Sequence, residues 1–189
     1  MKTIVITAET FLENEVKHIE RLFDAGLQGL HIRKPLADSD TIKRFIMAIN
    51  SAFHNRIIIH KHLELMEYFN LAGVHVKMSQ FKSLRIPFGI VSTSVHAQAE
   101  LEELDRQEGQ LFISPVYDSI SKKGYLANRD LLSLGTHARK GTLIALGGIN
   151  DQNIQKVKEH GFDGVALLGH IWESNSPLKR FLHIKNLIN

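Results

Sequence analysis

Residues 142–149 read Thr-Leu-Ile-Ala-Leu-Gly-Gly-Ile, a mostly apolar run that ends in two glycines. The run has no polar face, which predicts a strand buried on both sides, as in a parallel sheet. Residues without Cβ at the strand end let a ligand approach the backbone N–H groups. A second apolar run, residues 164–168, ends in Gly169. The two strand ends together predict a phosphate site, with two tight turns as the alternative explanation.

Short apolar runs recur along the whole chain and alternate with helical patterns. The predicted strands are residues 2–7, 29–33, 56–60, 73–76, 88–92, 110–114, 143–146 and 164–168. The predicted helices are residues 9–25, 38–53, 63–70, 97–106, 128–138, 150–160 and 178–188. Strands and helices in this alternation are typical of a (β/α)8 barrel. We therefore predict an α/β fold with one small TIM-barrel domain over residues 1–189, shorter than the roughly 250 residues usual for this fold.

The composition is that of a globular protein, with 43% hydrophobic and 23% charged residues. The absence of cysteine excludes disulfides, cysteine-ligated metal centres and a thiol nucleophile. The first residues contain no long apolar segment, so we expect no signal peptide, and no run reaches transmembrane length. These features favour a cytoplasmic location.

The charge pattern argues against large anionic partners. The 23 Lys and Arg residues give a net charge of +3 but are scattered along the chain. A nucleic-acid-binding protein normally gathers basic residues in a patch with interleaved aromatic residues. We therefore expect no nucleic-acid or membrane partner, and interpret the excess charge as a solvated surface or an attraction for small anionic substrates.

In a barrel of this kind, functional residues lie at the carboxyl ends of the strands. The residues that follow the predicted strands are rich in cations and hydroxyls and poor in carboxylates. They are Thr7, Glu9, Arg33, Lys34, His60, Lys61, His62, Lys77, Gln80, Ser92, Ser94, His96, Ser119, Ser121, Lys122, Lys123, Gly147, Gly148, Gly169 and His170. Such a set suits a phosphorylated ligand. It does not suit hydrolysis by a pair of carboxylates.

Several motifs fall in the order and spacing of one family. They are His31-Ile-Arg33, Gly73-Val-His75, Ser94-Val-His96, the segment from Ser114 to Lys122, Ala145–Ile149 and Asp163–Ala166. Over nearly its whole length the chain resembles the thiamine phosphate synthases and the related thiazole tautomerases (TenI-like proteins). The loop with Ser119, Ser121 and Lys122 is the most specific part of this resemblance, whereas Gly-Gly-Ile occurs in many phosphate-binding barrels.

The resemblance implies a reaction in which a pyrimidine diphosphate loses diphosphate and a thiazole phosphate nitrogen attacks the methylene carbon. It implies partners that are a small phosphorylated thiazole and a pyrimidine diphosphate, and it allows a homo-oligomer. The residues expected to act in catalysis are Arg33, Lys122, His60 and Lys61. The residues expected to bind phosphate are Ser94, Ser119, Ser121, Gly147, Gly148, Gly169 and His170.

The chain departs from the family where the family binds Mg²⁺. The synthases carry Asn-Asp after the third strand and a second Asp after the Gly-Val-His strand. This chain has His60-Lys61 and a position near Gln80, with Lys77 just before it. Mg²⁺ needs oxygen ligands, usually including carboxylates. We therefore predict no metal or other cofactor and doubt full Mg²⁺-dependent synthase activity.

Two explanations of this departure remain open. Lys61 and Lys77 could replace the metal, since a cation about 4 Å from a phosphate charge contributes about 4 kcal/mol at an effective dielectric constant near 20; the alternative is that both point into solvent. The protein could instead be a metal-independent thiazole tautomerase, although Pro115 occupies the position of the tautomerase histidine. In that case His31, His60, His96 or His170 would act as acid or base. A non-catalytic thiazole-phosphate-binding module is a further alternative.

Overall fold

The computed structural model describes residues 1–86, 88–118 and 127–188. Its strands are β1 (Lys2–Ile6), β2 (Gly29–Ile32), β3 (Ile57–Ile59), β4 (Gly73–His75), β5 (Ile90–Val95), β6 (Gln110–Ile113), β7 (Thr142–Leu146) and β8 (Gly164–Leu167). Its α-helices are α1 (Glu15–Asp24), α2 (Ser39–Ala48), α3 (Leu65–Phe69), α4 (Met78–Phe81), α5 (Gln98–Glu102), α6 (Ile154–Glu159), α7 (Gly169–Trp172) and α8 (Pro177–Ile188). Two 3-10 helices, η1 (Ser51–Arg56) and η2 (Arg129–Thr136), precede β3 and β7.

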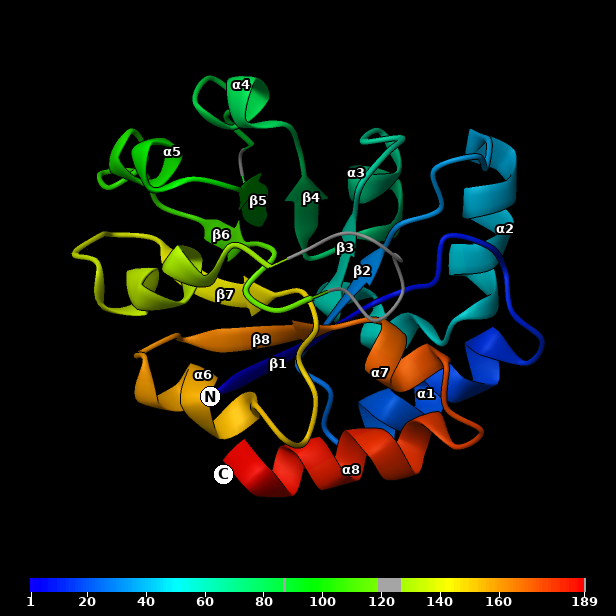
Figure 1. Ribbon diagram of the computed structural model, residues 1–189. Coiled ribbons are helices and arrows are strands. Elements are labelled where there is room, and N and C mark those ends of the chain that lie inside the picture. Colours follow the sequence, from blue (N-terminus) through cyan, green and yellow to red (C-terminus); the bar gives the residue numbers. More distant parts are fainter. Residues whose placement is uncertain (87, 119–126, 189) are drawn as a thin grey trace.

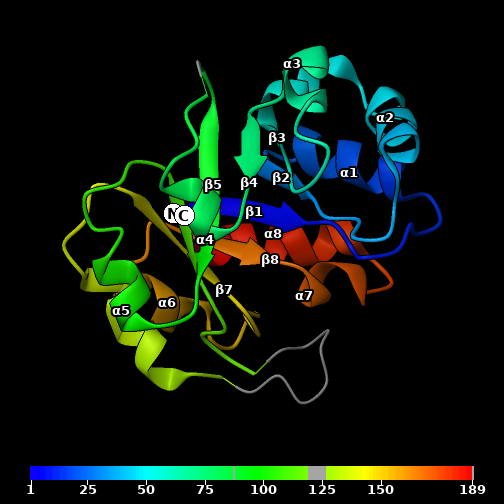
Figure 2. The same cartoon turned by 90° about the horizontal axis from the view of Figure 1, so that it is seen from above.

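The strands form a closed parallel barrel in chain order, which confirms the predicted (β/α)8 fold. β1 closes the barrel by pairing with β2 on one side and β8 on the other. The helices surround the strands, with α1, α2 and α3 on one side and α5 and α6 on the other (Figure 1, Figure 2). None of the helices in the described part of the chain has the length and apolar character needed to span a bilayer.

The residues of each strand alternate between the barrel interior and the layer under the helices. The outward residues join the large core beneath the helices, as Val5, Leu30 and Val165 do. The inward residues of β1, β6, β7 and β8 form a separate apolar cluster of Ile4, Ile6, Phe112, Ile144 and Ala166. The inward residues of β2, β4 and β5 are instead polar: His31, His75, Ser92 and Ser94. The interior therefore has a mainly apolar half and a mainly polar half, and the polar half also contains Ile58 of β3.

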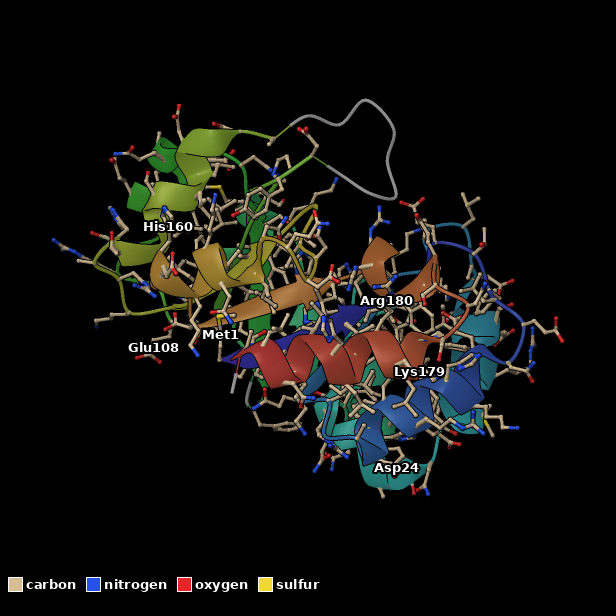
Figure 3. All side chains as sticks on the ribbon, turned by 60° about the horizontal axis from the view of Figure 1, so that its bottom comes forward. Met1, Asp24, Glu108, His160, Lys179 and Arg180 are labelled. Carbon is tan, nitrogen blue, oxygen red and sulfur yellow. The ribbon has the colours of Figure 1, made fainter. Side chains whose placement is uncertain are left out.

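Helix α8 covers β1 and β8 and contacts α1, α6 and α7. In Figure 3 this helix lies in front of the barrel, with Lys179 and Arg180 near its beginning. Short α7 follows β8 directly, and the indole N–H of Trp172 donates to the carbonyl oxygen of Ile6, 2.7 Å away. This bond fixes α7 at the carboxyl end of β1, beside the mouth of the barrel.

The predicted elements differ from the structure at several places. The helix predicted at 9–25 begins only at Glu15, the helix predicted at 38–53 is α2 followed by the 3-10 helix η1, and α4 was not predicted. β5 runs to Val95, beyond the predicted end at Ser92. The hydroxyl groups do not end this strand, because Ser92 donates to the carbonyl oxygen of Val74 on β4 and Thr93 donates to that of Val76, the residue after β4. The helix predicted at 128–138 is the 3-10 helix η2, and α7 was not predicted.

Candidate functional site

A cavity of about 350 Å³ opens at the carboxyl ends of the strands. Its lining includes the following residues of the predicted site: Arg33, His60, Ser94, Gly147, Gly148, Gly169 and His170. These residues come from β2, β3, β5, β7 and β8 or from the turns after them, so the barrel brings them together from distant parts of the sequence. Ser119, Ser121 and Lys122 lie outside the described residues.

The glycine turn after β7 is fixed by the segment that follows β6. Gly147 and Gly148 have φ angles of +103° and +61°, which residues with a Cβ atom rarely adopt. A Cβ on Gly148 would overlap the carbonyl oxygen of Asp118 and lie 2.7 Å from Cβ of Tyr117. The Tyr117 N–H also donates to the Gly147 carbonyl oxygen at 3.2 Å. The two glycines are therefore required by a tight turn and by close backbone packing, and that packing makes a rigid backbone wall of the cavity.

Both ends of the segment 119–126 are held at this wall. A carboxylate oxygen of Asp118 accepts a hydrogen bond from the Ala127 N–H at 2.7 Å. The Asn128 N–H donates to the carbonyl oxygen of Pro115 at 3.1 Å. Pro115 follows a cis peptide bond and lines the cavity. The described residues Asp118 and Asn128, on either side of positions 119–126, thus lie beside the glycine turn.

Arg33 and Lys34 point to opposite sides of the barrel wall. The Arg33 guanidinium lines the cavity and pairs with the Glu9 carboxylate at 2.5 Å. The Lys34 ammonium is buried outside the barrel, 2.7 Å from both carboxylate oxygens of Glu15. The structure therefore removes Lys34 from the predicted set of mouth residues, because consecutive residues of an extended chain face opposite sides.

The predicted lysines surround a second cavity of about 480 Å³, which Lys61, Lys77 and Gln80 line. The two cavities share His60, His75, Ser94 and His96, so they adjoin at the polar half of the barrel. The Lys61 ammonium donates to the carbonyl oxygen of Pro35 at 2.6 Å. This contact places the Lys61 charge at the rim, between the loops after β2 and β3.

Three histidines meet between the cavities and the barrel interior. Nδ1 of His31 lies 3.0 Å from Nε2 of His60. The rings of His60 and His75 stack at a centroid distance of 4.2 Å. His31 is fully buried, and burial lowers the pKa of His31 and of His60 well below the ordinary value. Burial, with the nearby Arg33 charge, lowers the pKa of His75 to about 4.

His31 was predicted only as one of four alternative acid–base residues and His75 was given no role, although the sequence contains a signal that both face the barrel interior. Each is a single polar residue between apolar neighbours on a short strand, Leu30-His31-Ile32 and Val74-His75-Val76. Residues two positions apart on a strand face the same side, and a polar residue between buried apolar neighbours in a barrel strand faces the interior. Because Arg33 faces the mouth, this alternation would have placed His31 in the interior below Arg33.

Two further histidines border the mouth. Nδ1 of His96 lies 2.8 Å from the carbonyl oxygen of Ser114, so this nitrogen carries the proton and donates it. Nε2 of His96 is therefore unprotonated in the neutral ring, and His96 lines both cavities. His170 lines the first cavity, and its buried Nε2 has no hydrogen-bond partner among the described residues. Burial lowers the pKa of His170.

The donor groups at the mouth do not fit Mg²⁺. Among the described residues that line the two cavities, Glu100 is the one carboxylate, and its Oε2 accepts the His96 backbone N–H at 2.6 Å. The remaining polar groups are imidazoles, hydroxyls, an amide and cations. Mg²⁺ prefers hard oxygen ligands in an octahedral arrangement. The site therefore differs in its metal-binding chemistry from a carboxylate-based magnesium centre.

The chain is similar to known proteins over most of its length. The thiamine monophosphate synthase family matches residues 3–171. A thiamine-phosphate synthase of Lawsonia intracellularis is 24% identical over 188 residues, covering 91% of this chain and 85% of that protein. One of Staphylococcus epidermidis is 23% identical over 137 residues, 66% of this chain and 63% of that protein. The chain thus matches less than two thirds of that relative's length.

A solved structure is similar as well. The thiamine phosphate pyrophosphorylase from Bacteroides thetaiotaomicron superposes with a TM-score of 0.78 at 31% identity, covering 99% of this chain and 97% of that chain. The family match covers the strands from β1 to β8 that form the mouth. With the barrel and its mouth as described, this chain belongs to the thiamine monophosphate synthase family.

Proposed function

We propose that the protein binds a phosphorylated thiazole at the mouth of the barrel and joins it to a pyrimidine diphosphate, as a thiamine-phosphate synthase. The observation that supports this most is the backbone wall formed by Gly147 and Gly148 against Tyr117 and Asp118. This wall borders the cavity that Gly169 and His170 also line. The thiazole phosphate would lie against this wall, and by the family resemblance Ser119 and Ser121, which lie outside the described residues, would also bind it.

The polar half of the mouth would receive the pyrimidine diphosphate. In the reaction the bond between the methylene carbon and the diphosphate oxygen breaks, and the diphosphate leaves with the electron pair. The thiazole nitrogen then uses its lone pair to form the new carbon–nitrogen bond. Arg33 would stabilise the negative charge that develops on the leaving group, and Lys61 and Lys77 would attract it from the second cavity. Ser94, which borders both cavities, would donate a hydrogen bond to phosphate.

The reaction proposed here has no step through Mg²⁺, because the donor groups at the mouth do not fit that ion. Cationic side chains of the chain itself carry the charge stabilisation instead. We therefore expect turnover with little or no dependence on added Mg²⁺. A homo-oligomer and a cytoplasmic location remain expectations of the family resemblance and the composition.

One observation favours a second candidate, a tautomerase acting on a thiazole carboxylate phosphate. The Ser114 carbonyl oxygen accepts a hydrogen bond from Nδ1 of His96, which leaves Nε2 as the second ring nitrogen of a residue that lines the cavity. A neutral imidazole in that orientation accepts a proton from a bound substrate. His96 rather than the residue at position 115 would then be the base.

Turnover assays with each substrate set distinguish the candidates. Untagged protein is incubated with thiazole phosphate and the pyrimidine diphosphate, with Mg²⁺ or with EDTA, and thiamine phosphate is measured. Formation of thiamine phosphate in both conditions supports the proposal, whereas strict dependence on Mg²⁺ contradicts the charge-stabilising role of the lysines. Conversion of the thiazole carboxylate tautomer alone would favour the tautomerase. No conversion in either assay would leave a binding module and refute both enzymatic functions.

A further inference from the structure

We propose that His31, His60 and His75 form a binding site for a zinc-class divalent cation at the base of the barrel mouth. One nitrogen from each ring lies within 4.8 Å of a nitrogen from the others. The three rings come from β2, the end of β3 and β4, three neighbouring strands of the barrel. The site goes beyond the proposed function and does not depend on it.

The type of ligand points to a metal other than Mg²⁺. Imidazole nitrogen is a ligand of Zn²⁺, Ni²⁺, Cu²⁺ and Fe²⁺, whereas Mg²⁺ takes oxygen. Metal binding requires the neutral ring, which offers a lone pair on one nitrogen. Three such rings from neighbouring strands place one nitrogen each within 4.8 Å of the others.

The pair of His31 and His60 already has nearly the spacing of two ligands on one ion. Their Nδ1 and Nε2 atoms are 3.0 Å apart. Two nitrogens on a tetrahedral Zn²⁺ with bonds of about 2.0–2.1 Å lie about 3.3 Å apart. The ion would take the place of the single proton that these two nitrogens share, and that proton would move to the other nitrogen of the ring that carries it. The ligand nitrogen of His75 lies within 4.8 Å of the other two, so small shifts of the three rings would close the site.

Hydrogen bonds orient His75 for this role. The Ser92 hydroxyl donates to the Val74 carbonyl oxygen at 3.2 Å, so its oxygen accepts from Nδ1–H of His75 at 3.0 Å. Nε2 of His75 then carries the lone pair and lies 3.2 Å from the Ser94 hydroxyl. A metal-binding histidine typically donates its second ring nitrogen to a fixed acceptor in this way. Ser92 is thus a positioning residue for the site.

The surroundings favour a ligand over a purely structural cluster. His60 and His75 line both cavities, which leaves the open side of the ion accessible to water or an anionic ligand. The nearby Arg33 charge opposes a cation, but its partner Glu9 offsets part of that charge.

Titration of the untagged, metal-free full-length protein with Co²⁺, and with Zn²⁺ in competition, tests the site. We expect one ion per chain and the visible absorption of Co²⁺ bound to nitrogen ligands in a site of low coordination number. The variants His31→Gln and His60→Asn should each weaken binding by more than the roughly 10- to 100-fold that an orienting partner contributes. Ser92→Ala should weaken it by about 10-fold.

His62→Asn is the matched control, because His62 lies two residues from His60 but bonds to the Ala37 carbonyl oxygen at 3.1 Å. This variant should bind Co²⁺ like the unsubstituted protein. Equal binding by all variants, or no binding by the unsubstituted protein, would overturn the proposal. Should a cluster variant fail to fold, X-ray absorption of the Zn²⁺-bound unsubstituted protein decides, with three imidazole ligands expected and fewer than two overturning the site.

Discussion

The Lys34 ammonium lies 2.7 Å from both carboxylate oxygens of Glu15, and both side chains are 1% exposed. The ammonium also donates to the Thr10 carbonyl oxygen at 2.7 Å. This buried pair joins the end of β2 to the beginning of α1 outside the barrel. Lys34 therefore stabilises the outer side of the barrel next to Arg33 and does not line the mouth.

Removing one partner of this pair should strongly destabilise the protein. In Lys34→Met the Glu15 carboxylate stays buried without its cation, which typically costs about 3–5 kcal/mol. Urea unfolding at pH 7 measures the change in the free energy of unfolding. The double variant Lys34→Met with Glu15→Leu should recover most of the loss, because no buried charge remains. Equal losses in the single and double variants would contradict this explanation.

The glycine turn gives a prediction about phosphate binding. A methyl group at Gly148 would collide with the Asp118 carbonyl oxygen, so Gly148→Ala should displace the wall of the cavity. Loss of one hydrogen bond to a charged group is worth about 1.5–3 kcal/mol, so thiazole phosphate affinity should fall by about tenfold or more. Isothermal titration calorimetry of the folded variant measures this affinity.

Gly161→Ala is the control for backbone strain. Gly161 also has a positive φ, +79°, but an added Cβ would come no closer than 3.3 Å to another atom. It follows α6, away from the cavity. This variant should lose about 1–2 kcal/mol of stability and keep its affinity for thiazole phosphate. If both variants lose affinity to the same extent, strain rather than the wall explains the effect.

The neutral histidines of the barrel interior predict a loss of stability in acid. The folded-state pKa of His75 is about 4, against an ordinary value of 6.5. As the pH falls through 6.5, the unfolded chain binds protons that the folded protein does not, so stability declines until the folded pKa is reached. For His75 alone the loss between pH 7 and pH 4 is about 3 kcal/mol.

We expect this whole decrease in the free energy of unfolding, because none of the groups that face His75 carries a negative charge that would stabilise the protonated ring. They are the neutral rings of His31 and His60, the Arg33 cation, the Ser92 and Ser94 hydroxyls and the Phe112 ring. Urea unfolding of the metal-free protein from pH 7 to pH 4 measures the slope. His75→Asn should flatten it and His62→Asn should not. An unchanged slope in His75→Asn would assign the acid sensitivity to other groups.

Arg33 should determine affinity for the diphosphate. Arg33→Gln removes the one guanidinium of the described cavity lining, and KM for the pyrimidine diphosphate should rise by about 10- to 100-fold. Steady-state kinetics with thiazole phosphate at saturation measures KM. Arg44→Gln, which changes an exposed arginine on α2, should leave KM unchanged. The assigned role of Arg33 fails if its replacement alters only the affinity for thiazole phosphate.

The sequence was sufficient to predict the barrel and half of its mouth. Apolar runs such as residues 143–146 define strands by local pattern, and the glycines after β7 and β8 line the cavity, while their role in binding phosphate stays a prediction. The direction of Lys34 was missed because the prediction included the polar residues that follow a strand end without regard to the alternation of the extended chain. The buried pair with Glu15 joins residues 19 positions apart and has no local signal.

The histidine cluster could not be predicted from spacing. His31 and His60 are 29 positions apart and meet only because β2 and β3 are neighbours in the barrel. The end of β5 was misplaced because Ser92, Thr93 and Ser94 looked like a loop. Their hydroxyls bond to β4 or to His75, so the polar residues continue the strand.

Calorimetric titration of the unsubstituted protein with thiazole phosphate, without added metal, is the most direct test of the function proposed here. We predict one thiazole phosphate bound per chain, with an affinity that Mg²⁺ does not change and that inorganic phosphate reduces by competition. Absence of any detectable binding heat, confirmed by the absence of competition in equilibrium dialysis, would contradict the assignment of the mouth as a thiazole phosphate site.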